Sequence, residues 1–257
     1  MLELFHRSAG RSRPDGRSTL CMGLVMRSNI RTYSKDEQLV ASRRKEIALA
    51  AASVFVKKGY EQTSIREIGD RSGMGRGTLY HYVGSKEDIL YLVATLGREH
   101  YADFFKKADI LIKTVNETVN ATQALQEAIK DFYSKVGERQ DIMLFFYQGA
   151  RKLPPAMRKE VLDWEEDVVG IFERLLAKGC DSGEFEIDDI VTVAHHIVCG
   201  GEMWATRRWF LKRRYTLEQY IGKETEFFLR AVGQGMEGEK PKLRGNLVLL
   251  EEVDKGL

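Results

Sequence analysis

The 257-residue sequence has few cysteines, few prolines and no long uncharged apolar run. Its three cysteines, Cys21, Cys180 and Cys199, are odd in number and far apart, which argues against a disulfide framework and predicts a reducing, cytoplasmic location. The longest uncharged run in the C-terminal half covers only residues 190–201 and contains two histidines. Because a membrane-spanning helix needs about 20 apolar residues, we expect neither a membrane span nor a membrane partner.

Net charge is also low, but it is unevenly distributed. Forty Lys and Arg residues against 38 Asp and Glu give +2, whereas the first 35 residues alone carry +5. The first 90 residues sum to +6, which leaves −4 for the remaining 167. This asymmetry is typical of a chain that meets a polyanion at one end. Residues 1–35 show no regular period and are expected to be a flexible basic arm, which either follows a nucleic-acid backbone or is simply solvated.

With only four prolines, the chain has room for long helices, and its apolar residues recur at helical spacing. No segment alternates with period two for long enough to predict a strand, so the expected fold class is all-α. Helices are predicted at 35–58, 64–73, 75–83, 85–108, 120–136, 140–151, 155–179, 188–211 and 216–232, with a break at Gly179 and the four residues after it. The expected domains are 1–35 (arm), 36–86 (three helices), 87–233 (helical body) and 234–257 (tail).

Residues 63–87 carry the most informative pattern, two short helices joined by a tight turn at Gly73. Ser64, followed three residues later by Glu67, predicts a capping box at the start of the first helix. Such a pair forms a helix-turn-helix, whose second helix can enter the major groove of DNA. That helix is too short to bury all its polar and aromatic side chains, which leaves some of them to contact phosphates or base edges. The alternative is a helix-turn-helix that serves packing inside an enzyme or an RNA-binding protein.

The pattern resembles the DNA-binding domain of the TetR family of transcriptional regulators. The matching residues are Gly59-Tyr60, Thr63, Gly73, Gly77-Thr78-Leu79-Tyr80, Tyr82 and Ser85-Lys86-Glu87. The departures are Gly69 where the family usually has alanine, Met74 for valine, Gly75 for a capping serine and Val83 for phenylalanine. Because glycine is itself an acceptable N-cap, losing the serine should cost only a few tenths of a kcal/mol.

The resemblance implies a three-helix DNA-binding domain followed by a helical effector-binding and dimerisation domain. It implies a ligand-responsive regulator, most simply a repressor that a small apolar effector releases from a palindromic double-stranded DNA operator. The implied DNA contacts are Ser64, Arg76, Gly77, Thr78, Tyr80, His81, Tyr82 and Lys86. Lys86 also begins a helix, where a phosphate is favoured. A regulator without an effector, an activator and an all-α enzyme remain the alternatives.

The body carries no catalytic or metal-binding motif, so we expect no enzymatic activity, metal or cofactor. His195 and His196 point about 100° apart on a helix and cannot easily share a metal. An effector pocket is expected among Phe145, Phe146, Tyr147, Arg151, Trp164, Met203, Trp204 and Arg207, although such aromatic residues more often pack in a core. Residues 200–204 loosely resemble family members that sense acyl-CoA thioesters, whose phosphates Arg151, Arg207 or Arg208 would meet.

The last two long predicted helices each carry a wide apolar face. These faces comprise Ile190, Val193, Ala194, Ile197, Val198, Gly201 and Ala205 in the first helix, and Leu217, Tyr220, Ile221, Phe227, Phe228, Ala231 and Val232 in the second. The resemblance implies a homodimer through residues 188–232. A core within one chain would demand the same apolar pattern.

Overall fold

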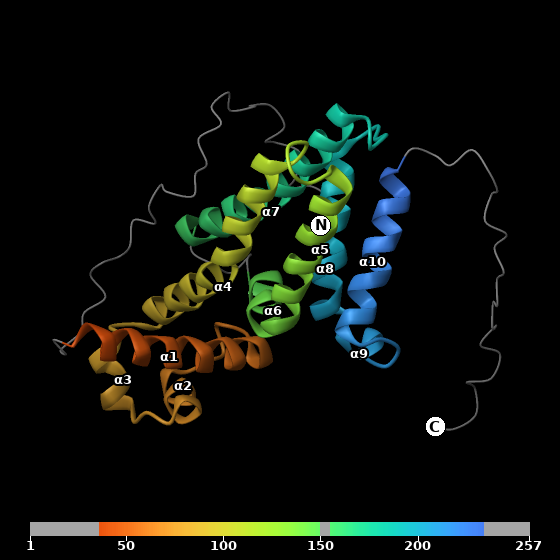
Figure 1. The fold of residues 1–257 in the computed structure, drawn as a ribbon. Coiled ribbons are helices and arrows are strands. Elements are labelled where there is room, and N and C mark those ends of the chain that lie inside the picture. The colour runs from red at the N-terminus through yellow and green to blue at the C-terminus, as the bar shows by residue number, and fades with distance from the viewer. Residues whose placement is uncertain (1–35, 150–154, 234–257) are drawn as a thin grey trace, which may run out of the picture.

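The computed structural model describes residues 36–149 and 155–233. These residues form helices and no strand, which confirms the all-α class (Figure 1). The helices are α1 (Glu37–Lys58), α2 (Ile65–Ser72), α3 (Arg76–Tyr82), α4 (Lys86–Thr114), α5 (Ala121–Glu138), α6 (Gln140–Gly149), α7 (Pro155–Ser182), α8 (Ile190–Thr206), α9 (Arg208–Leu211) and α10 (Leu217–Val232). The expected arm, the expected tail and Arg151 lie outside the described residues.

Three helix boundaries differ from the sequence-based expectation. The long helix α4 continues past residue 108 to Thr114. Gly179 does not end α7, which runs on to Ser182 and ends at Gly183, whose φ of 77° lies in the left-handed region that glycine tolerates. A Cβ at Gly179 would clash with the Phe185 ring, so this glycine permits a close contact instead of a turn. The single helix expected at 188–211 is divided into α8 and α9 at Arg207.

The helices that surround the turn at Gly73 begin at residues that the sequence marks. Ser64 Oγ accepts a hydrogen bond from the backbone N–H of Glu67 at 3.2 Å, and the Glu67 carboxylate accepts from the backbone N–H of Ser64 at 2.9 Å. This is the predicted capping box. Ser85 caps α4 in the same way by accepting from the backbone of Asp88. The start of α3 at Gly75 has no side-chain cap.

The apolar residues form two cores. The first core joins α1, α2 and α3 to the beginning of α4 and to α6, and its members include Ile47, Ala51, Phe55, Ile68, Leu79, Val83, Ile89, Val93, Leu96, Phe145 and Phe146. The second core is built from the rest of α4 together with α5, α7, α8 and α10. In Figure 1, α1–α3 lie at one end, α4 runs away from them, and α10 lies on the opposite side. The first core therefore extends beyond residue 86, because α4 and α6 take part in it.

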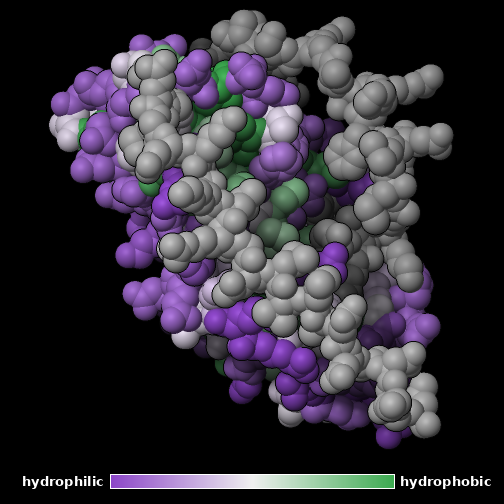
Figure 2. All heavy atoms as spheres, turned by 90° about the vertical axis from the view of Figure 1, so that its right-hand side faces the viewer, coloured by the Kyte–Doolittle hydropathy of each residue, from purple (hydrophilic) through white to green (hydrophobic). Residues whose placement is uncertain are grey.

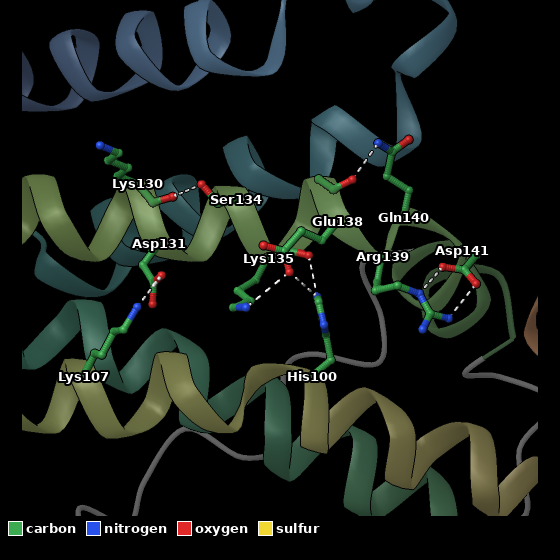
Figure 3. Close-up of polar contacts among 11 residues, drawn as sticks. His100, Lys107, Lys130, Asp131, Ser134, Lys135, Glu138, Arg139, Gln140 and Asp141 are labelled. Carbon is green, nitrogen blue, oxygen red and sulfur yellow. Dashed lines mark hydrogen bonds and ion pairs between the residues drawn. The ribbon is translucent and has the colours of Figure 1, made fainter. Parts of the chain in front are cut away.

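Polar contacts also join α4 to α5 (Figure 3). Lys107 Nζ lies 3.2 Å from a carboxylate oxygen of Asp131. About two turns nearer the start of α4, His100 Nε2 lies 2.8 Å from the carbonyl oxygen of Lys135 and 3.9 Å from the Glu138 carboxylate. The C-terminal half of α4 is thus fixed to α5, while its N-terminal part packs against α1 in the first core.

Candidate DNA-binding surface and effector site

Helix α3 presents most of the expected DNA-contacting residues to solvent. Leu79 is fully buried and fixes one side of the helix in the first core. Arg76, Gly77, Thr78 and His81 are exposed, whereas Tyr80 and Tyr82 are half-buried. The guanidinium carbon of Arg76 lies 5.8 Å from the centre of the Tyr80 ring, which is a cation–π contact. The exposed side of α3 therefore carries the donors and aromatic groups that phosphates and base edges require.

Arg44 of α1 holds the C-terminal end of α3. Its Nε donates a hydrogen bond of 3.0 Å to the backbone carbonyl of Tyr82. Burial lowers the pKa of Arg44, although the charge of Asp88 acts in the opposite direction. Nothing in the sequence pattern marks Arg44, because a basic residue on an amphipathic helix gives no sign of a partner 38 positions away.

Lys86, in the first turn of α4, is held against Tyr60. Its Nζ lies 4.3 Å from the centre of the Tyr60 ring and donates to the carbonyl oxygen of Glu61 at 3.2 Å. The Tyr60 hydroxyl lies 3.4 Å from the Glu87 carboxylate, and burial, followed by the charge of Glu87, raises the pKa of Tyr60 to about 12. Lys86 is therefore a positioned cation at a helix N-terminus, which suits an anionic ligand.

Ser64 is exposed, but its hydroxyl belongs to the cap of α2. The partner of that cap, Glu67, also forms an ion pair with Lys58. The hydrogen bond from Lys58, followed by those from Ser64, lowers the pKa of Glu67 to about 2. A contact between Ser64 and a DNA backbone would be made by a residue that already has a structural role.

Three of the expected pocket residues meet in the interior. Phe145 and Phe146 are buried with ring centres 5.3 Å apart, and the Phe146 ring lies 6.3 Å from that of Trp164. A Cβ at Gly97 of α4 would lie 2.8 Å from the Phe146 ring, so the glycine allows α6 to pack directly on α4. The Trp164 ring is 5.0 Å from Tyr101 of α4, in an edge-to-face arrangement.

The other expected pocket residues do not join this group. Trp204 is buried in the second core, with its ring 5.3 Å from that of Tyr220. Met203 and Arg207 are exposed at the surface. Arg151 lies outside the described residues. Tyr147 belongs to α6, but its side chain is not among the described ones.

Polar side chains that the sequence analysis did not select lie beside Trp164. The Tyr101 hydroxyl and the Trp164 indole N–H are buried and have no hydrogen-bond partner in the described part of the chain. Burial and then the charge of Glu165 raise the pKa of Glu202 to about 7, and burial also raises the pKa of Glu165. Glu202 acts in turn on Tyr101, whose pKa is raised mainly by burial. These four residues, Tyr101, Trp164, Glu165 and Glu202, are called the buried polar group after the two buried atoms of Tyr101 and Trp164, and the two glutamates are half-buried. Apart from Trp164, which the aromatic spacing selects, its sequence signal is the acidic Glu202 directly after an uncharged run.

A series of ring contacts connects this region to Lys86. It begins at Trp164 and Phe146 and continues through Phe145, whose ring stacks on Phe55 of α1 with 5.4 Å between centres. The Phe55 ring is in turn 5.4 Å from Tyr60, on which Lys86 lies. The aromatic series (Trp164, Phe146, Phe145, Phe55 and Tyr60) thus links α7 to the first turn of α4 through α6 and α1.

The described residues contain no group of three His, Cys, Asp or Glu side chains that could hold a metal ion. His195 is exposed, and its Nδ1 lies 2.9 Å from the backbone carbonyl of Val191, while His196 is exposed as well. Within the same residues, no helix is long and apolar enough to cross a membrane.

The apolar faces of α8 and α10 pack mostly within the chain. Their buried members are Ala194, Ile197, Val198, Gly201 and Ala205 in α8, and Tyr220, Ile221, Phe228 and Val232 in α10. Phe227 differs sharply from its neighbour, since 63% of it is exposed against 4% of Phe228. Val191 and Met203 are exposed on α8. Figure 2 looks onto the α10 side of the molecule and shows hydrophobic residues at the surface among hydrophilic ones.

Two family models match the chain. One, described as bacterial regulatory proteins of the tetR family, matches residues 47–92, which contain α2 and α3. The other, described as the tetracyclin repressor-like C-terminal domain, matches residues 118–232. Together they span more than half of the sequence.

Individual relatives agree with this match. The HTH-type transcriptional regulator HbdR from Aromatoleum sp. (strain CIB) is 23% identical over 233 residues, which are 88% of this chain and 98% of that protein. The structure of FadR from Bacillus subtilis with stearoyl-CoA is 23% identical with a TM-score of 0.55, covering 72% of this chain and 96% of that one. The structure of AibR with isovaleryl coenzyme A and operator DNA is 19% identical with a TM-score of 0.60, covering 72% of this chain and 97% of that one. The two structures share the fold of this chain.

Proposed function

Because this chain belongs to the TetR family of bacterial transcriptional regulators, we propose that it is a cytoplasmic repressor that a small apolar effector releases from operator DNA. The observation that carries the proposal is the exposed polar side of α3, which lies within the residues that match the family model. Helix-turn-helix proteins place this second helix in the major groove.

On the DNA, the residues of the surface have different tasks. Arg76 is exposed at the start of α3 and reads a base edge, because a guanidinium group can bind guanine through two hydrogen bonds. Lys86, held by Tyr60, neutralises a phosphate and contributes affinity without sequence preference. Tyr80, His81, Tyr82, Thr78, Gly77 and Ser64 complete the proposed contact surface.

The effector occupies the region where Phe146 and Trp164 meet the buried polar group. Its aromatic walls suit an apolar chain, and its unpartnered polar atoms suit a ligand that brings hydrogen-bonding capacity. The two solved relatives, FadR and AibR, hold acyl-CoA thioesters. An acyl thioester is therefore the effector class that we propose.

Effector binding reaches the DNA surface through α4 and the aromatic series. Tyr101 of the buried polar group and Lys86 belong to the same helix, and Phe145 and Phe55 provide a second route through α6 and α1. A small displacement of α4 or α6 at the effector would therefore change the orientation of α3 and the position of Lys86 together.

Two copies of the chain form the active unit. The exposed apolar residues Val191 and Met203 of α8 and Phe227 of α10 form the proposed contact between copies, since the rest of the two apolar faces is used inside the chain. A symmetric pair presents two α3 helices to successive major-groove faces about 34 Å apart, which requires a palindromic site.

The experiment is a selection of binding sites from random double-stranded DNA by the full-length protein, followed by footprinting of the selected sequence. We expect one discrete palindrome. Arg76→Ala should relax the preference at a single base pair, whereas an exposed lysine far from the surface, such as Lys106→Ala, should change nothing. Recovery of no preferred sequence, or unchanged operator affinity in Arg76→Ala and Lys86→Ala alike, would contradict the proposed function.

A further inference from the structure

Among the buried polar atoms of the described residues that have no hydrogen-bond partner, two belong to neighbouring side chains of the body. The hydroxyl of Tyr101, a residue only 1% exposed, and the indole N–H of Trp164 are both buried without a partner in the described part of the chain. The two rings lie edge to face with 5.0 Å between their centres, so the two side chains are neighbours between α4 and α7. A buried donor without a partner is costly, because it has lost its water and gained nothing in exchange. An indole N–H can only donate, which means that the missing group is an acceptor.

The carboxyl groups of the same site restrict what that acceptor can be. Glu165 follows Trp164 in α7, and Glu202 comes from α8. Burial is the main cause that raises the pKa of each carboxyl, and each acts on the thiol of Cys199 as well, so the two negative charges share one region. Among the described residues, no basic side chain contributes to the shift of either carboxyl. An anionic acceptor would therefore meet like charges at half-buried positions.

We propose that the buried polar group is a carbonyl-recognition site, which accepts the uncharged carbonyl of an acyl ester or thioester and rejects the free carboxylic acid. The Tyr101 hydroxyl and the Trp164 N–H donate to the carbonyl oxygen, while the acyl chain extends along the Phe146 ring. Rejection of the acid follows from the two glutamates, because specificity can be built from a repulsive contact as well as from an attractive one. The inference rests on the proposed function, since it concerns the same effector site.

The test compares four compounds with the same chain by calorimetry on the full-length protein. These are dodecanoyl-CoA, methyl dodecanoate, dodecanoate and dodecyltrimethylammonium, and the set is repeated with shorter and longer chains. We expect the thioester and the methyl ester to bind, and the carboxylate to bind at least about tenfold more weakly than the methyl ester. The methyl ester separates recognition of the carbonyl from any contribution of the coenzyme.

Conservative variants assign the effect to the named residues. The double variant Glu165→Gln/Glu202→Gln should bind the carboxylate about tenfold better and the methyl ester nearly as before. The difference in affinity between the two compounds, called the ester–acid gap, should therefore disappear. Glu127→Gln, an exposed glutamate on α5, is the matched control and should leave the gap unchanged. Tyr101→Phe and Trp164→Phe should each weaken the methyl ester about threefold to tenfold, because each removes one hydrogen bond. Melting curves confirm that every variant is folded.

Three results would overturn the inference. These are equal binding of acid and ester by the wild type, a gap that persists in the double glutamine variant, or the tightest binding by the cationic amphiphile. If the thioester binds and weakens operator binding but the acid does so equally, the inference alone fails. If no compound binds at any chain length, the proposed effector class fails together with it.

Discussion

The DNA-facing surface and the buried polar group treat their polar side chains in opposite ways. Around α3, the residues that hold the surface in place are paired: Arg44 with the Tyr82 carbonyl, Lys86 with Tyr60 and Glu61. In the described part of the body, Tyr101 and Trp164 have buried polar atoms without partners, and Glu165 and Glu202 share one acidic region. The polar side chains that support the first region have their partners within the chain, and its exposed groups remain available for DNA. The two buried atoms of the second region have no partner among the described residues.

The difference has opposite consequences for binding affinity and for folding stability. A surface that is already paired gains affinity from phosphates and base edges without rearranging, as rigid recognition requires. A buried site with unsatisfied donors lowers the stability of the empty protein by about 1–3 kcal/mol per group. In the function that we propose, ligand binding recovers that free energy and α4 carries the resulting change toward Lys86.

The largest effect is expected in the body, at two adjacent phenylalanines. Phe228→Glu places an unpaired carboxylate in the second core and should reduce the free energy of unfolding by about 3–5 kcal/mol or abolish folding. Phe227→Glu changes the exposed neighbour and should leave the fold intact but separate the two copies. Thermal melting and sedimentation distinguish the two outcomes. A folded dimer in both variants would contradict both the core position of Phe228 and the place of Phe227 in the contact between copies.

The acidic part of the buried polar group should make stability depend on pH. Because the pKa of Glu202 is raised from 4.5 to about 7, the folded protein holds this proton more tightly than the unfolded chain does. Stability from this group is therefore full below pH 4.5 and decreases as the pH rises toward 7. Glu202→Gln should be more stable than the wild type by up to about 3 kcal/mol in mildly alkaline buffer and equally stable in acid. Melting curves across this range that run parallel for the two proteins would contradict it.

Gly69 of α2 should resist replacement by alanine, the residue of the TetR pattern at this position. A Cβ at Gly69 would lie 2.7 Å from the backbone carbonyl oxygen of Met74, and that carbonyl belongs to a tight turn that cannot shift freely. Gly69→Ala should therefore lower the free energy of unfolding by about 1–3 kcal/mol, despite the higher helix propensity of alanine. Gly77→Ala, where a Cβ meets open space, is the control and should change stability little. Urea denaturation measures both.

The smallest effect concerns a single phosphate contact. Lys86→Ala should weaken binding to every DNA sequence and reduce the slope of log affinity against log salt by about one unit. Tyr60→Leu, which removes the ring under Lys86 but keeps the charge, should weaken binding less and leave the slope unchanged. An identical salt slope in the wild type and in Lys86→Ala would remove Lys86 from the contact surface.

The two regions also differ in how far the sequence predicts them. The helix-turn-helix depends on local signals, such as the capping box at Ser64 and the glycine at 73, so its helices and exposed residues could be predicted. The buried polar group depends on residues from three helices that are distant in sequence, and no local pattern brings Tyr101 near Trp164 and Glu202. Aromatic spacing selected Phe145, Phe146 and Trp164 but also Trp204, which packs in the second core instead. Periodicity likewise cannot tell that Phe227 faces outward and Phe228 inward.

The most direct test of the account is the operator affinity of the full-length protein with and without saturating acyl-CoA thioester, measured at several chain lengths alongside calorimetry of the same ligands. Because coupling between two sites is reciprocal, we expect the thioester to weaken operator binding by about 5–150-fold and the operator to weaken thioester binding by the same factor. Phe145→Ala, which interrupts the aromatic series between α6 and α1, should reduce that factor while both ligands still bind. A thioester that binds by calorimetry while the operator affinity stays constant would contradict the account.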